Sequence, residues 1–122
     1  MQKLPTLVFP IYPLPEHFAE KLHAYTRPRS DRTRVKDLID LTLIPEELGL
    51  EPSQALARVI EAVFAQYSTH PLPAPDAVEP PPESWRAPYR AMAEELGFPV
   101  ADVFEAHRRL QGFLRRCWEQ VT

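Results

Sequence analysis

The stretch "RTRVKDLIDLTLI", Arg32–Ile44, decides the fold that we expect for this chain. Residues suited to a protein core recur in it at positions i, i+3, i+4 and i+7, the spacing that defines one face of an α-helix. The buried face predicted in this way consists of Val35, Leu38, Ile39 and Thr42. Leu41 and Ile44 fall outside that face, so we expect other parts of the protein to cover the opposite side of the helix as well.

The same helix carries a stripe of charged side chains away from its predicted core, formed by Lys36, Asp37 and Asp40. Two interpretations stay open. Lys36 and Asp40 are four residues apart and can form an ion pair on a solvated face, a contact that contributes only about 0.2–0.5 kcal/mol. Alternatively, the carboxylates face a cleft and take part in chemistry.

A lysine in the preceding helix bears on this choice. Lys21 lies at the margin of an apolar stripe, so its stem can run over the core edge while its ammonium group enters a cleft. That stripe consists of Phe18, Leu22 and Tyr25. The connecting stretch "RPRSDRTRVK", residues 27–36, holds five basic residues and one acid, although the chain has a net charge of −3. This pattern suggests either a local phosphate or nucleic-acid contact or a solvated loop with ion pairs.

The remaining sequence predicts a mainly α-helical protein with about five helices and an N-terminal extended arm or edge strand. The arm, residues 1–14, contains "LPTLVFPIYPL", whose prolines cannot donate to a sheet and leave at most an edge strand. Caps, prolines and apolar periodicity indicate helices from Pro15 to before Arg27, from Ser30 or Thr33 to Pro45, from Pro52 to Tyr67, from Trp85 or Pro88 to Leu96 before Gly97, and from Pro99 to Gln120.

The length of 122 residues fits a single helical domain, residues 1–122. Within it we expect the arm at 1–14, helices at 15–68, a stiff proline-rich connector at 69–84 and a helical pair at 85–122. No apolar run reaches the ~18 residues of a membrane span, and the N-terminus lacks the long apolar segment of a signal peptide. With one cysteine, Cys117, the chain forms no internal disulfide, and we expect a cytoplasmic location.

Several short motifs appear in an order that is found in a known family. The stretch "AEKLHAYTRPRSDRTRVKDLIDLTLI", Ala19–Ile44, follows "FPIYPLPEHF" and precedes a proline-rich segment with "SWRAPYRAMAEELGF", residues 84–98. This order resembles the C-terminal portion of the AbiEii/AbiGii family, nucleotidyltransferase-like toxins of bacterial abortive-infection and toxin–antitoxin systems. The resemblance covers most of the chain.

The resemblance implies roles for particular side chains. Lys21, Arg34 and Lys36 would contact nucleotide phosphates. Asp37 would act as the base or activating carboxylate for the acceptor hydroxyl, and Asp40 would support its geometry. These residue types suit nucleotidyl transfer, which needs cations against a triphosphate and a carboxylate near the nucleophile.

The sequence also departs from the family pattern. A complete member carries a Gly-Ser pair followed by Asp-x-Asp, whose carboxylates bind Mg or Mn and thereby organise the nucleoside triphosphate. Neither motif occurs here: the glycines are Gly49, Gly97 and Gly112, and none precedes serine. We therefore expect a truncated, C-terminal portion that binds no cofactor by itself and is inactive alone. Its expected partners are a missing N-terminal half, an antitoxin, RNA or a second copy.

A non-enzymatic alternative also stays open, namely an interaction or dimerisation module that pairs through the arm, or an RNA-contacting module that uses Arg27–Lys36. Other constellations are weaker. His17, Glu20 and His23 spread too widely around a helix to bind one metal, so we expect no metal site. We expect Cys117 to be buried and inert and His107 to be a hydrogen-bonded core residue. Trp85 and Tyr89 should pack the fourth helix.

Overall fold

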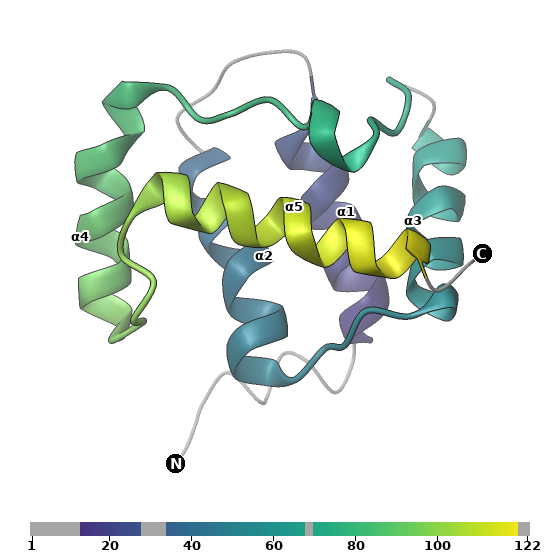
Figure 1. Ribbon diagram of the computed structural model, residues 1–122, viewed down its shortest axis with the longest axis horizontal. Coiled ribbons are helices and arrows are strands. Elements are labelled where there is room, and N and C mark those ends of the chain that lie inside the picture. The colour runs from purple at the N-terminus through teal and green to yellow at the C-terminus, as the bar shows by residue number, and fades with distance from the viewer. Residues whose placement is uncertain (1–12, 28–33, 68–69, 120–122) are drawn as a thin grey trace.

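The computed structural model describes residues 13–27, 34–67 and 70–119, and over these residues it is mainly helical (Figure 1). This confirms the predicted fold class. The helices are α1 (Leu14–Tyr25), α2 (Arg34–Leu48), α3 (Gln54–Tyr67), α4 (Arg86–Leu96) and α5 (Val103–Glu119), with 3-10 turns η3 (Pro75–Ala77) and η4 (Glu83–Trp85). The predicted arm, apart from its last two residues, lies outside the described residues, as do the expected caps Ser30 and Thr33.

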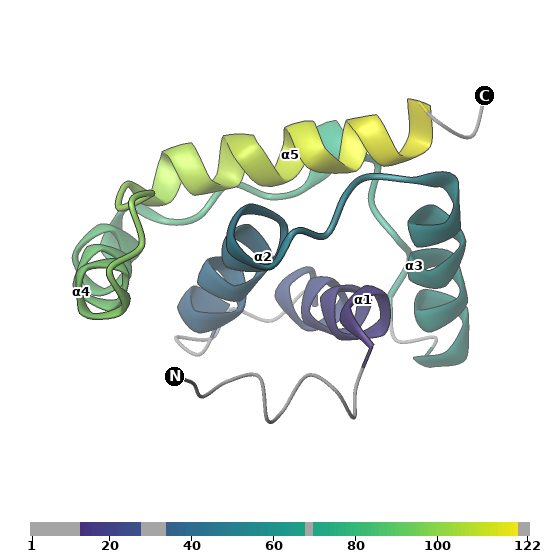
Figure 2. The same cartoon turned by 90° about the horizontal axis from the view of Figure 1, so that it is seen from below.

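Helix α2 is the centre of the packing. It contacts α1, α4 and α5, while α1 also packs against α3. Figure 2 shows α5 on one side of the molecule, with α1 and α2 beneath it and with α3 and α4 towards its two ends. An aromatic contact between Phe18 of α1 and Phe113 of α5, with ring centroids 5.1 Å apart, closes the space between these layers.

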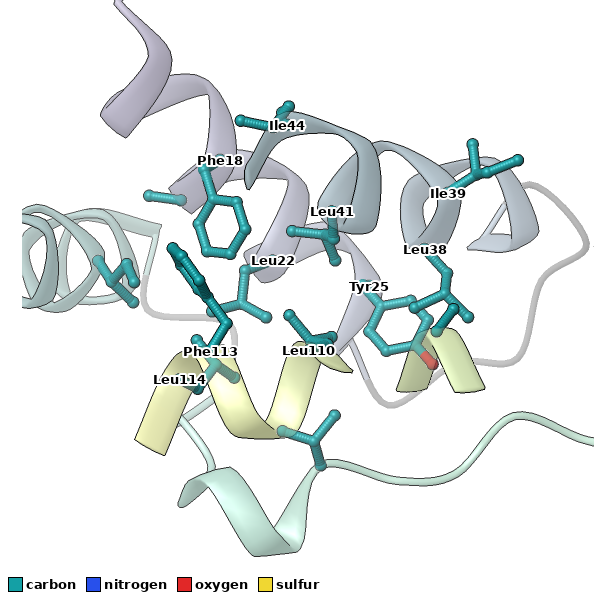
Figure 3. Close-up of a cluster of buried hydrophobic side chains, with 14 of the residues drawn as sticks. Phe18, Leu22, Tyr25, Leu38, Ile39, Leu41, Ile44, Leu110, Phe113 and Leu114 are labelled. Carbon is teal, nitrogen blue, oxygen red and sulfur yellow. The ribbon is translucent and has the colours of Figure 1, made fainter. Parts of the chain in front are cut away.

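The burial of α2 extends beyond the face that its periodicity predicts. Val35, Leu38 and Ile39 are buried as expected, and Leu41 and Ile44 are each only 1% exposed. Leu41 and Ile44 belong to the same core as Leu22, Leu110 and Leu114 (Figure 3). The expectation that both sides of this helix are covered is therefore confirmed.

Two predicted helix ends are wrong, and both have local causes. Pro45 does not stop α2, which continues to Leu48. Its fixed φ suits a helix, and its missing N–H removes one bond of the last turns. Gly49, with φ of 79°, follows the helix instead. Helix α5 begins at Val103 rather than near Pro99, because the Asp102 carboxylate accepts a hydrogen bond from the Phe104 N–H at 3.3 Å.

The proline-rich connector is partly extended and partly turned. Its described residues contain the two 3-10 turns, and Val78 between them is buried. The Val78 carbonyl lies 2.9 Å from Nε2 of His107 on α5. His107 is thus a hydrogen-bonded core histidine, as predicted, and it fixes the connector to the last helix.

Gly97, which has a positive φ, gives a test of the end of α4. We predict that Gly97→Ala destabilises the protein by about 1 kcal/mol, because Gly97 has φ of 70° and a Cβ there would meet open space, so the cost is conformational alone. Gly112→Ala is the matched control, since Gly112 is helical and its replacement by alanine should stabilise by up to about 1 kcal/mol. Denaturant unfolding measures the change in the free energy of unfolding of each variant. Changes of the same sign in both variants would contradict the assignment of Gly97 as the left-handed residue that ends α4.

Candidate functional site

Lys21 of α1 lies between two carboxylates of α2. Its Nζ is 3.0 Å from Oδ2 of Asp40 and 3.6 Å from Oδ1 of Asp37. All three side chains are partly buried, with exposed fractions of 27% for Lys21, 16% for Asp37 and 26% for Asp40. The sequence prediction placed these three residues in one site, and the structure brings them together at the seam between α1 and α2.

Burial and charge act in opposite directions within this cluster. Burial raises the pKa of Asp37 above its ordinary value; the Lys21 ammonium group opposes that rise, and the nearby Asp40 carboxylate adds to it. Burial alone would lower the pKa of Lys21, but the hydrogen bond and charge of Asp40, together with Asp37, raise it. The cluster therefore holds a firmly protonated amine beside a carboxylate that is more basic than usual.

Arg34, for which the family resemblance implies a phosphate contact, is the first residue of α2. Its side chain is buried, and Nη1 donates to the carbonyl oxygens of Tyr25, at 3.3 Å, and of Arg27. These carbonyls belong to the end of α1, where helix geometry leaves acceptors unsatisfied. Arg34 thus ties the start of α2 to the end of α1, and its charge also opposes the rise in the pKa of Asp37.

Lys36 is exposed on α2. Among the ion pairs formed by the described residues, Asp40 pairs with Lys21 and not with Lys36. The i, i+4 pair that the sequence allows is therefore replaced by a contact between helices. A helical wheel places Asp40 on the polar face of α2, but it does not show which cation of α1 lies close to that carboxylate.

The end of α1 also borders a groove that the sequence did not indicate. The groove has a volume of about 620 Å³ and lies between α1 and the proline-rich connector. Its walls include Arg27, Arg34 and His70, the acidic Glu79, and Trp85, besides several connector prolines. Because its basic residues come from segments far apart in the sequence, periodicity alone could not group them.

His23 and His70 form an aromatic cluster beside this groove. Their ring centroids are 4.5 Å apart, and His23 also contacts Phe64 and Tyr67. The Thr26 hydroxyl lies 2.9 Å from Nε2 of His70. Burial lowers the pKa of both histidines. The charges of His70 and Arg27 lower the pKa of His23 further. The charges of Arg27 and Arg34 lower the pKa of His70, whereas a hydrogen bond with the backbone of His23 opposes that change.

A metal ion requires several side-chain ligands that converge on one point. Within residues 13–27, 34–67 and 70–119 no three His, Cys, Asp or Glu side chains gather as a metal-binding group. Asp37 and Asp40 offer two carboxylates, but the Lys21 ammonium group already lies between them. A magnesium ion prefers octahedral oxygen coordination, so this donor set does not fit the metal of a complete nucleotidyltransferase.

Three other sequence predictions concern packing. Cys117 is buried and free, and burial raises the pKa of its thiol, which makes it a poor nucleophile. Trp85 and Tyr89 are both buried against the core, as expected for residues that pack α4. Burial also raises the pKa of Tyr89 to about 12, although nearby Thr42 opposes that rise.

The fold and the site together describe a helical protein with a half-buried cation between two carboxylates. The chain belongs to the AbiEii family: the family model described as "Nucleotidyl transferase AbiEii toxin, Type IV TA system" matches residues 1–116. Comparison with curated proteins and with solved structures returned no match. No helix of the described residues has the length and apolar character that crossing a membrane requires.

The contacts of Arg34 give a stability prediction. Arg34→Lys should destabilise the protein by about 2 kcal/mol, because lysine has a single ammonium nitrogen in place of the forked guanidinium group and cannot donate to both carbonyls from the same position. Urea unfolding measures the loss. Arg58→Lys is the control, since Arg58 is 52% exposed and should change stability by no more than about 0.5 kcal/mol. Equal stability of both variants would show that the Arg34 contacts do not hold α1 to α2.

The raised pKa of Asp37 predicts a pH dependence. At neutral pH, Asp37→Asn should unfold at the same temperature as the wild type or higher, because burial disfavours the charged carboxylate. The folded pKa lies above the ordinary 3.8, so as the pH falls the folded protein takes up this proton before the unfolded chain does. Between the folded and the ordinary pKa of Asp37, the stability of the wild type relative to the variant should therefore increase as the pH falls. It should decrease again as the pH rises through the folded pKa.

Thermal unfolding of both proteins between neutral pH and 3.8 tests this sign. Asp76→Asn, which removes a carboxylate that is 80% exposed, controls for the change in net charge. A growing advantage of Asp37→Asn on acidification would contradict the raised pKa.

Proposed function

We propose that this chain supplies the nucleotide-contacting helices of an AbiEii-type nucleotidyltransferase toxin. The observation that carries the proposal is the Lys21 ammonium group, held between Asp37 and Asp40 at the seam of α1 and α2. Membership of the nucleotidyltransferase toxin family supports a triphosphate as the ligand. In this proposal Lys21 contacts phosphate, Asp37 accepts a proton, and Asp40 positions Lys21.

The chemistry follows from the three groups. An ammonium group has three N–H donors, so Lys21 can keep one bond to Asp40 while it donates to a phosphate oxygen. When Lys21 turns towards phosphate, Asp37 loses part of its neutralising partner and becomes a better proton acceptor. An acceptor hydroxyl would then give its proton to Asp37 as its oxygen attacks the α-phosphorus, and pyrophosphate would leave.

We also propose that the chain corresponds to the C-terminal portion of a complete family member and does not transfer nucleotides alone. The support is the sequence itself, which contains neither the Gly-Ser pair nor Asp-x-Asp. A triphosphate carries several negative charges, and Lys21 is one cation. The Arg34 guanidinium group is engaged with the carbonyls of Tyr25 and Arg27 and adds charge at a distance.

Two assays test the proposal together. In equilibrium binding with each nucleoside triphosphate, the wild-type chain should bind weakly, and Lys21→Met should bind at least about tenfold more weakly because it loses the charge-assisted contact. Arg90→Met, an exposed change on α4, is the control. In the second assay, the purified chain with magnesium or manganese, labelled nucleotide and total RNA should give no incorporation.

The outcomes separate the two claims. Equal triphosphate binding by the wild type and Lys21→Met would overturn the role of the cluster. Incorporation by the wild type that disappears in Asp37→Ala would overturn the need for a missing half. Activity that appears only when a Gly-Ser/Asp-x-Asp protein is added would support a split enzyme.

A second candidate function is RNA contact through the basic groove at the end of α1. The groove supports it because two arginines, Arg27 and Arg34, line a volume of about 620 Å³ with one acid, Glu79. Such a groove suits a phosphate group or a nucleotide. Weaker RNA binding by Arg27→Gln, with unchanged triphosphate binding, would favour this function over the first.

A further inference from the structure

A second groove, with a volume of about 630 Å³, lies between α5 and the C-terminal half of α2. Side chains of α5 line one wall, and side chains of α2 and of the loop that follows it line the other. We call it the α5 groove. Lys21, Asp37 and Asp40 do not line it, so a ligand bound here lies apart from the proposed nucleotide site.

Apolar side chains form the floor of the α5 groove. Leu41 of α2 and Leu110 and Phe113 of α5 line it, and all three belong to the core. Figure 3 shows these three side chains in one cluster. Leu50, which is partly buried, adds apolar surface from the loop after α2. A ligand in this groove therefore gains free energy by covering apolar surface.

Three acids and three arginines line the walls of the groove. They are Glu46, Glu51, Glu105, Arg108, Arg109 and Arg116. Four of these side chains form a continuous chain of ion pairs. Glu105 pairs with Arg108 at 2.6 Å and with Arg109 at 3.0 Å, and Arg109 also pairs with Glu46 at 2.9 Å. Because the six charges sum to zero, the groove offers a polyanion no net attraction.

The chain of ion pairs leaves one acid and one arginine over. Within residues 13–27, 34–67 and 70–119, the side chains of Glu51 and Arg116 form neither an ion pair nor a hydrogen bond. Nη1 of Arg116 lies 3.6 Å from the position that a Cβ of Gly112 would occupy, and Gly112 lines the same wall. Glu51 belongs to the opposite wall. The groove thus presents one unpaired anion and one unpaired cation beside an apolar floor.

A ligand that matches this groove has a cationic end for Glu51, an anionic end for Arg116 and an apolar body between them. The two ends must be separated, because Glu51 and Arg116 line different walls and do not pair with each other. A free α-amino acid carries both charges on a single carbon. A peptide of two or three residues carries an ammonium group and a carboxylate at opposite ends, and it spans about 7–10 Å when extended.

We propose that the α5 groove binds a short apolar peptide of two or three residues with both ends free. Its ammonium group donates to the Glu51 carboxylate, and its carboxylate accepts from the Arg116 guanidinium fork, which matches carboxylate geometry. Its apolar side chains cover Leu110 and Phe113. A longer protein chain offers one terminus to the groove and leaves either Glu51 or Arg116 unpaired. The proposal does not rest on the nucleotide site.

The test titrates the full, ¹⁵N-labelled chain with the peptide Leu-Ala-Leu and follows the backbone amide resonances of Leu50 and Gly112 by NMR. Both resonances should shift and saturate. Arg116→Gln and Glu51→Gln should each weaken binding about tenfold, because each removes a hydrogen bond between charged groups. Gly112→Leu should abolish binding by filling the groove, while its melting temperature stays equal or rises, since leucine favours a helix over glycine.

Matched controls separate the groove from a general effect of charge. Arg90→Gln and Glu95→Gln remove the same charges from exposed positions on α4 and should bind the peptide as the wild type does.

Changes in the peptide identify the partner of each end. The C-terminal amide of Leu-Ala-Leu should bind the wild type about tenfold more weakly, and Arg116→Gln should cause no further loss with that ligand. The N-acetyl peptide should behave in the same way with Glu51→Gln. Gly-Gly-Gly keeps both charged ends but has no apolar side chains, so it should bind at least about tenfold more weakly than Leu-Ala-Leu.

Several results would overturn the proposal. They are the absence of shifts at millimolar peptide, wild-type affinity of Arg116→Gln or Glu51→Gln, and an equal loss of binding in the α4 controls. Equal affinity for free leucine would show that the ligand is a single amino acid. Shifts of the same resonances on dilution without peptide would show that a second copy of the chain occupies the groove. Lys21→Met should bind the peptide normally, so failure of the nucleotide site remains distinguishable.

Discussion

The structure depends on the enclosure of α2. A helix that buries Leu38 and Ile39 on one side and Leu41 and Ile44 on others cannot lie on the surface of a simple helical pair. It requires α1, α4 and α5 around it, and these three helices do contact it.

Enclosure makes the buried polar groups of α2 need partners, since an unpaired buried polar group costs free energy. Thr42 donates to the Leu38 carbonyl at 2.8 Å, and Arg34 donates to carbonyls at the end of α1. Asp37 and Asp40 receive the Lys21 ammonium group. The packing that encloses α2 thus also places the groups of the candidate site, and it holds them in position before any ligand binds.

Helix α5 has an apolar inner face and a charged outer face. Its inner face, with Leu110, Phe113 and Leu114, closes the core. Its outer face carries four exposed arginines, Arg108, Arg109, Arg115 and Arg116.

The sequence by itself determined the helices and most of their ends. Apolar periodicity located the core faces, and Gly97 marked the end of α4, because these signals act within a few residues. The sequence also indicated Lys21, Asp37 and Asp40, through spacing and family resemblance. Only the tertiary structure decided that Asp40 pairs with Lys21 rather than Lys36, and that Arg34 is directed to the carbonyl oxygens of Tyr25 and Arg27. These outcomes depend on which helices come together, and the packing of distant residues, which local spacing does not encode, sets that.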